Sequence, residues 1–202
     1  MVARRQYDPV RRRRELCDAA IELIAGGGIR ALTHRAVDKQ IGLAEGTTSG
    51  YFRTRDALLR AVFDRVADRY LCDMIAWTEG TGSGSGRPGT LGLAHLVMLY
   101  AEGSGALLNK ARVELTFHAV RDPDLDERVK AIGWEFYTRA KAVIAADPAA
   151  ASDPVALEHQ TFVTLTFLDG VFNGFARNLP MFADATELNS RIQGILRGFG
   201  KS

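Results

Sequence analysis

The chain has 202 residues, of which 47% are hydrophobic and 25% charged, and its 26 basic side chains nearly balance 24 acidic ones. These proportions are those of a globular protein with a core, so they exclude a disordered, a collagen-like and a purely coiled-coil chain. Two cysteines are too few for a disulfide scaffold, and the apolar runs fall short of the ~18 residues of a membrane span. The N-terminal charges precede no apolar stretch, so this segment does not have the pattern of a secretory signal peptide. We therefore expect a cytoplasmic protein with no membrane partner.

The charge is distributed unevenly along the chain. Residues 1–70 hold 14 basic and 9 acidic side chains, a balance of +5, whereas residues 71–202 hold 12 and 15, a balance of −3. Most of the excess lies in an arginine-rich arm that contains Arg4, Arg5 and residues 11–14. A basic segment of this kind is typical of phosphate contact, although a merely solvated surface has the same composition.

Helical periodicity runs through nearly the whole chain. From Leu16, apolar residues recur at i, i+4, i+7 and i+8, which predicts a helix over about 11–25, and the glycines at 26–28 end it. A Gly/Ser-rich stretch over 78–90 divides the chain, and no alternating strand pattern competes with the helices. We predict an all-α protein of about nine helices, the others lying at about 33–40, 46–52, 56–77, 91–102, 104–120, 123–146, 153–178 and 185–199.

The most informative segment spans residues 32–59. Thr33 is a typical N-cap for a short helix, and Gly42 allows a sharp turn before a second short helix that begins near Gly46. Two helices joined by a glycine-containing turn predict a helix-turn-helix, whose second helix can enter the major groove of DNA. The small hydroxyl side chains of that second helix suit contacts with base edges and phosphates.

This segment, LTHRAVDKQIGLAEGTTSGYFRTRDALL, resembles the N-terminal DNA-binding domain of the TetR family of bacterial transcriptional regulators. The matching features are the glycine-ended first helix, LTxRAV, the G-L turn, GTT and YFRTRDALL. The resemblance implies a three-helix helix-turn-helix domain over 1–56 and a larger helical effector-binding and dimerisation domain over 57–202. It also implies contacts with double-stranded operator DNA from the start of the second helix, the recognition helix and the start of the fourth helix, namely Thr33, His34, Arg35, Gly46, Thr47, Thr48, Ser49, Tyr51 and Arg55.

Three residues depart from the family pattern. Asp38 stands where a small alanine is usual, Ser49 replaces a commoner tyrosine, and Gly50 lies inside the recognition helix at a cost of ~1 kcal/mol relative to alanine. These departures leave open which bases the helix reads. We expect Phe52 to be a core residue and Asp56 a helix cap rather than a contact residue. His34 is expected to be exposed, as a phosphate contact or as a solvent-facing side chain.

The resemblance places a homodimer interface on the last two helices. One helix-turn-helix covers one half-site, so a two-fold dimer would place two recognition helices about one DNA turn (~34 Å) apart. Packing within one subunit is the alternative for these apolar residues. The candidate interface residues are Phe162, Leu165, Phe172, Leu188, Ile192, Ile195 and Phe199.

The larger domain is also expected to hold an effector pocket. Its candidate residues are aromatic or weakly polar and lie on helices that would surround a cavity, with plain core packing as the alternative for each. A lining of this kind suits a mostly apolar small molecule of unknown identity. The candidates are Trp77, His95, Met98, Phe117, His118, Trp134, Tyr137 and Phe167.

Enzyme signatures are weak in this sequence. The G-x-G-x-x-G match at 84–89 follows no strand, and the acidic residues at 122, 124 and 126 lack the glycine and glutamate of a calcium loop. The four histidines and two cysteines have no metal-ligand or redox spacing, and both cysteines are expected to be buried. We expect no catalytic residue, no metal and no cofactor.

Together these features predict a sequence-specific transcriptional regulator. We expect a ligand-responsive repressor that binds a palindromic operator as a homodimer. An activator or a ligand-independent DNA binder of the same type is the first alternative. A helical small-molecule-binding protein or enzyme that has lost DNA binding is the second.

Overall fold

The structure, a computed structural model, describes residues 8–78 and 89–199, so Arg4, Arg5 and most of the Gly/Ser-rich stretch lie outside the described residues. Within those ranges the chain forms nine α-helices and one 3-10 turn, and no strand. The all-α prediction is therefore confirmed. The helices are α1 (Pro9–Gly27), α2 (His34–Gln40), α3 (Thr47–Tyr51), α4 (Arg55–Thr78), α5 (Thr90–Leu99), α6 (Gly103–Ala119), α7 (Pro123–Ala145), α8 (Pro154–Ala176) and α9 (Ala185–Phe199).

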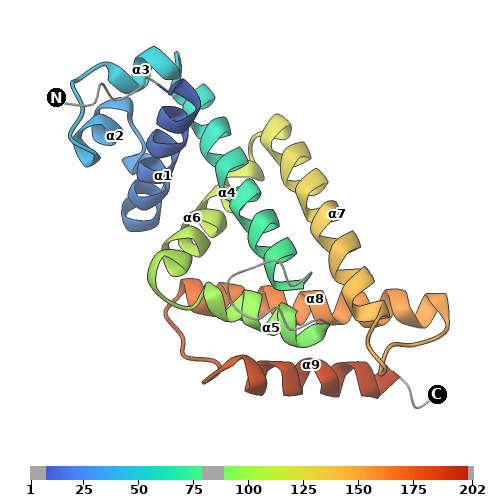
Figure 1. Ribbon diagram of the computed structural model, residues 1–202. Coiled ribbons are helices and arrows are strands. Elements are labelled where there is room, and N and C mark those ends of the chain that lie inside the picture. Colours follow the sequence, from blue (N-terminus) through green and yellow to red (C-terminus); the bar gives the residue numbers. More distant parts are fainter. Residues whose placement is uncertain (1–7, 79–88, 200–202) are drawn as a thin grey trace.

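α1 packs against the beginning of α4, and α2 packs against α1 and α3 (Figure 1). The predicted apolar stripe of α1 is buried except for the half-buried Leu23, and it shares a core with Leu58 and Val62 of α4. Arg65 of α4 donates two hydrogen bonds to the Asp18 carboxylate of α1, at 2.8 and 3.0 Å. α4 therefore belongs to the N-terminal core and also continues into the rest of the molecule.

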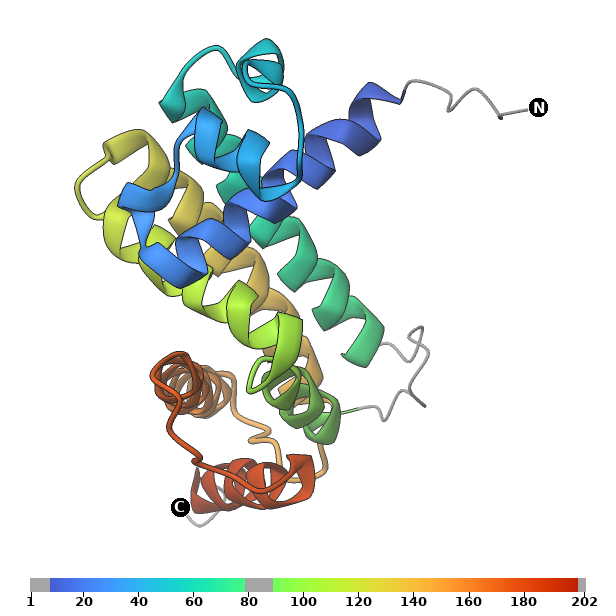
Figure 2. The ribbon, with the colours of Figure 1, turned by 90° about the vertical axis from the view of Figure 1, so that its left-hand side faces the viewer.

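The remaining helices form a second layered body. Figures 1 and 2 show α8 and α9 at the end of the molecule opposite α2 and α3. Asp122 and Asp153 cap α7 and α8 through their side chains, and each is followed by a proline in the first turn of its helix. α6 packs against α1, so it joins the two bodies.

Part of the apolar face of α9 is buried inside the subunit. Leu188 and Ile192 are fully buried, because α9 packs on α5 and α8 of its own chain. The Gln160 amide of α8 donates to the Leu196 carbonyl at 2.9 Å and fixes this packing. The expectation that Leu188 and Ile192 face a partner subunit is therefore wrong.

The two cysteines differ in their surroundings. Cys17 is buried in α1, as expected, and burial raises the pKa of its thiol to about 11. Cys72 is exposed on α4, so the expectation that it is buried is wrong.

In the described part of the chain, no single helix has the length and apolar character needed to cross a membrane. The consecutive helices α5 and α6 reach that threshold together, and they are bent by 88° at their break.

Candidate nucleic-acid interface and interior cavity

The turn between α2 and α3 rests on two glycines. α2 begins after Thr33, whose hydroxyl accepts a hydrogen bond from the Ala36 backbone N–H at 3.1 Å. Gly42 has φ +66° and Gly46 has φ +93°, conformations that glycine adopts without the steric cost of a side chain. The helix-turn-helix expected from the sequence is present, and Gly46 is the N-cap of α3.

Asp38 of α2 caps the N-terminus of α3. Its carboxylate is 2% exposed and accepts the Gly46 N–H at 2.9 Å, the Thr48 N–H at 2.8 Å and the Thr48 hydroxyl at 2.5 Å. A negative charge at this end of a helix is also favoured by the helix dipole. The departure from the family pattern at this position thus holds the two short helices together.

The side chains of α3 divide between the core and the surface. Thr48 is fully buried (0% exposed), so the expectation that it is exposed toward DNA is wrong. Ser49 and Gly50 are exposed, while Thr47 and Tyr51 are half-buried. The Ser49 hydroxyl donates to the Gly46 carbonyl at 2.8 Å, and the Thr47 hydroxyl donates to the Ala44 carbonyl at 2.6 Å. Both oxygens keep the capacity to accept a hydrogen bond from outside.

The C-terminal end of α3 is held from two sides. Arg13 of α1 donates to the Tyr51 carbonyl at 2.8 Å, and its guanidinium carbon lies 4.4 Å from the centre of the Phe52 ring. The His34 Nε2 lies 2.7 Å from the Phe52 carbonyl, to which it donates. Phe52 is buried, as predicted, whereas the expectation of an exposed His34 is wrong because its ring is half-buried. The arginine-rich turn of α1 and the start of α2 therefore both meet α3.

Arg55 fastens the start of α4 to the segment between α1 and α2. Its Nε donates to the Leu32 carbonyl at 3.0 Å, and its Nη2 donates to the Ile29 carbonyl at 2.6 Å. These bonds give Arg55 a structural role that its position at a helix start does not reveal. Its contact with DNA phosphate stays a prediction.

Exposed cations lie on α1 and at the start of α2, the two elements that contact the end of α3 through Arg13 and His34. Arg11 and Arg14 of α1 are exposed, as are Thr33 and Arg35 at the start of α2. Arg35 approaches only Glu45, at 3.7 Å between two largely exposed side chains, which is a weak interaction in water. These side chains of α1 and α2 are thus accessible to phosphates.

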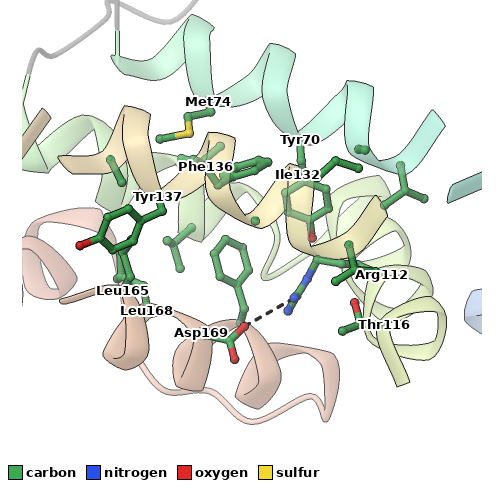
Figure 3. Close-up of a pocket in the computed structure, with 18 of the residues that line it drawn as sticks. Tyr70, Met74, Arg112, Thr116, Ile132, Phe136, Tyr137, Leu165, Leu168 and Asp169 are labelled. Carbon is green, nitrogen blue, oxygen red and sulfur yellow. Dashed lines mark hydrogen bonds and ion pairs between the residues drawn. The ribbon is translucent and has the colours of Figure 1, made fainter. Parts of the chain in front are cut away.

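The second body holds a partly open cavity of about 370 Å³ (Figure 3). Residues from α4 to α8 line it, and most of them are apolar or aromatic. Tyr137 lines it as expected. Leu165 and Phe172, which the sequence placed in the dimer interface, line the cavity instead. The size is in the range of small-molecule sites.

The other expected pocket residues lie elsewhere. Phe117 and Trp134 are each 68% exposed, because they occupy the outer faces of α6 and α7. The remaining five residues also lie outside the cavity wall. Trp77 stacks on His95, and Phe167 packs edge-on against Phe182. Met98 packs against the core, and His118 lies in a surface groove between α6 and the end of α1.

Charged and polar groups gather at one end of the cavity. Figure 3 shows Arg112, Thr116 and Asp169 together at this end, with Tyr137 at the other. The Arg112 Nε donates to the Asn109 Oδ1 at 3.2 Å, and its Nη1 lies 3.5 Å from the Asp169 Oδ1. Tyr70 also donates to Asn109, at 3.3 Å, and burial raises the pKa of the Tyr70 hydroxyl. Sequence reasoning missed Arg112, because α6 also carries Lys110 and Glu114, and no motif shows which of its charged residues faces the cavity.

No group of three or more His, Cys, Asp or Glu side chains within residues 8–78 and 89–199 could hold a metal ion.

The comparisons with known proteins agree with this geometry. Residues 16–62 match the family model of bacterial regulatory proteins, tetR family. A putative TetR-family transcriptional regulator from Rhodococcus sp. is 19% identical over 94% of this chain and 98% of its own, with a TM-score of 0.69. A transcriptional regulator from Rhodococcus sp. Rha1 is 16% identical over 93% and 95%, with a TM-score of 0.72.

A further solved structure holds a ligand. The multidrug binding protein EbrR complexed with malachite green is 20% identical over 93% of this chain and 97% of its own, with a TM-score of 0.58. No curated protein matches the sequence. Residues 16–62 therefore form the helix-turn-helix DNA-binding domain of bacterial regulatory proteins of the tetR family, and the chain has the fold of solved transcriptional regulators.

Proposed function

We propose that the chain is a ligand-responsive transcriptional repressor without catalytic activity, which binds a palindromic operator in the cytoplasm as a homodimer. The observation that carries this proposal is the fixed presentation of α3. Asp38 holds its first turn and Arg13 its last, while Ser49 and Gly50 remain exposed. A helix held at both ends presents its side chains to the major groove at little cost in entropy.

Base contacts in this proposal come from Thr47, Ser49 and Tyr51, with Gly46 and Gly50 allowing a close approach of the backbone. Hydroxyl groups can donate to or accept from base edges, and the threonine methyl can contact a thymine methyl. The buried Thr48 supports the helix and takes no part in the contact.

Phosphate contacts in this proposal come from Thr33 and Arg35 on one flank of α3 and from Arg11 and Arg14 on the other. Each lysine or arginine that neutralises a phosphate releases counterions, so specific binding should weaken steeply as salt rises. Arg55 contributes to this surface chiefly by holding the segment from Ile29 to Leu32 in place.

Dimerisation would use the outer face of α8. Phe162 is 64% exposed and Val155 63% exposed, and both lie on this helix together with the partly exposed Val163. Exposed apolar side chains that gather on one helix are typical of an interaction surface. Ile195 and Phe199 of α9 are half-buried and remain candidates for the edge of the same interface. The division into domains at residues 56 and 57 is part of this proposal.

Ligand response would pass through α6. Arg112 and Thr116 face the cavity from this helix, while other residues of the same helix pack on α1. A ligand that displaces α6 would also displace α1 and the attached α2 and α3. The ligand changes DNA affinity only if it binds the two arrangements with different affinity.

The test is a selection of bound fragments from the genome of the source organism, followed by a reporter assay with the selected site. The proposal predicts enrichment of a two-fold symmetric sequence and a reporter whose expression falls when the protein is present. Expression that rises instead would identify an activator. Enrichment of no sequence would contradict specific DNA binding.

A further inference from the structure

Arg112 enters the cavity with a hydrogen-bonding group that has no partner. Its Nη2 is buried and makes no hydrogen bond within the described structure. An unsatisfied buried donor of a charged side chain is costly, and such groups in folded proteins normally have a partner. The guanidinium therefore lacks one acceptor, which a bound molecule supplies when the side chain turns its Nη2 toward the cavity.

The groups around Arg112 leave its charge only partly compensated. Its ion pair with Asp169 is long, at 3.5 Å, and the Asp169 side chain is 61% exposed, so water screens this interaction. The other oxygen of Asp169 accepts from the Asn173 amide at 2.9 Å. Asn109 accepts from both Arg112 and Tyr70. The cavity wall around the guanidinium is otherwise mostly apolar.

The aromatic rings at the Arg112 end of the cavity already have a cation, the Arg112 guanidinium, near their faces. The guanidinium carbon of Arg112 lies 5.4 Å from the ring centre of Phe172 and 6.0 Å from that of Tyr70. A cationic ligand would compete with Arg112 for these rings and would be repelled by it, whereas an anion would be attracted.

We infer that the cavity binds a small apolar molecule with one anionic oxygen group, a carboxylate in its simplest form, that accepts a hydrogen bond from the Arg112 Nη2. A cavity of about 150 Å³ holds one benzene. The volume of about 370 Å³ therefore suits a body of about two rings, placed among residues such as Leu96, Phe136 and Leu168. This inference rests on the proposed function only in taking the cavity as the effector site.

The experiment measures binding of three naphthalene probes to the full chain by calorimetry. The probes are 2-naphthoate, its neutral amide 2-naphthamide and the cation 2-naphthylmethylammonium, which share one apolar body. The variants are Arg112→Met, Arg112→Lys and the matched control Lys110→Met. The control removes the same charge from the same helix at a residue outside the cavity wall.

For the wild type we expect 2-naphthoate to bind at least about tenfold more tightly than either other probe. This is the difference in affinity that one charge-assisted hydrogen bond produces. Arg112→Met should abolish this preference while 2-naphthamide binds as before, which shows that the cavity is intact. Arg112→Lys should retain a reduced preference, and Lys110→Met should behave as wild type. A wild type that binds the cation as tightly as the carboxylate, or binds none of the probes, overturns the inference, as does an unchanged preference in Arg112→Met.

DNA affinity is measured separately, with and without 2-naphthoate. Binding of 2-naphthoate through Arg112 with no change in DNA affinity would support the ligand class and contradict the ligand response of the proposed function. The inferred ligand class and the proposed ligand response can therefore be contradicted separately.

Discussion

Replacing Asp38 by alanine should loosen the helix that we propose reads DNA. The substitution removes the acceptor of two backbone N–H groups and of the buried Thr48 hydroxyl. α3 has five residues, too few to be stable alone, since isolated helices shorter than about 12 residues are marginal in water. Its order therefore depends on contacts such as these.

The magnitude follows from the three hydrogen bonds. Loss of one N-cap costs about 1 kcal/mol, and each buried donor left without an acceptor costs about 1–3 kcal/mol. Because one carboxylate serves all three donors and α3 can open locally to reach water, the costs do not add fully. We expect Asp38→Ala to lower the free energy of unfolding by about 3 kcal/mol, and Thr48→Val, which removes one hydroxyl, by about 1 kcal/mol.

Urea unfolding and hydrogen exchange followed by mass spectrometry measure these effects. Exchange should accelerate in peptides covering residues 46–52 of Asp38→Ala and change little in α7. The control is Asp56→Ala, which removes an exposed carboxylate from the first turn of α4. Unchanged exchange over 46–52, or a loss of stability no larger than that of Asp56→Ala, would refute the capping role.

Three further predictions test other parts of the structure. Arg55→Leu should lower the melting temperature, because the Ile29 and Leu32 carbonyls lose their donor, whereas Arg35→Leu on the exposed surface should not. In the folded protein at pH 8, one thiol per chain should react with a disulfide reagent, because Cys72 is exposed whereas Cys17 is buried and its thiol has a pKa of about 11. A second thiol that reacts equally fast would contradict this prediction. Phe162→Asp should shift the protein from dimer to monomer in sedimentation without unfolding it, and a dimer that persists would place the interface elsewhere.

The sequence predicts the local geometry of the helix-turn-helix well. Thr33 and Gly42 are found in the roles expected for them, because a cap and a left-handed turn depend on residues close in sequence. The side of α3 that faces outward could not be predicted in the same way. Five residues show no clear period, so nothing in the sequence separates buried Thr48 from exposed Ser49.

Contacts between distant residues account for the other missed features. Asp38 caps α3 from the preceding helix, ten residues before Thr48, where no adjacent capping pattern reveals it. On α7 the cavity residues follow a helical stripe from Val129 through Ile132 and Phe136 to Ala140, which the sequence contains. Trp134 lies off that stripe and is exposed, so aromatic character alone was a poor guide to the cavity.

The most direct test of the central claim is the affinity of α3 variants for the selected operator. Ser49→Ala and Tyr51→Ala should each weaken binding to that operator by about tenfold, as expected for lost base contacts, while binding to unrelated DNA stays within error of wild type. The melting temperature of Ser49→Ala, which changes an exposed residue, should also stay within error of wild type. Wild-type affinity for the operator in both variants would contradict the claim that the exposed residues of α3 read DNA.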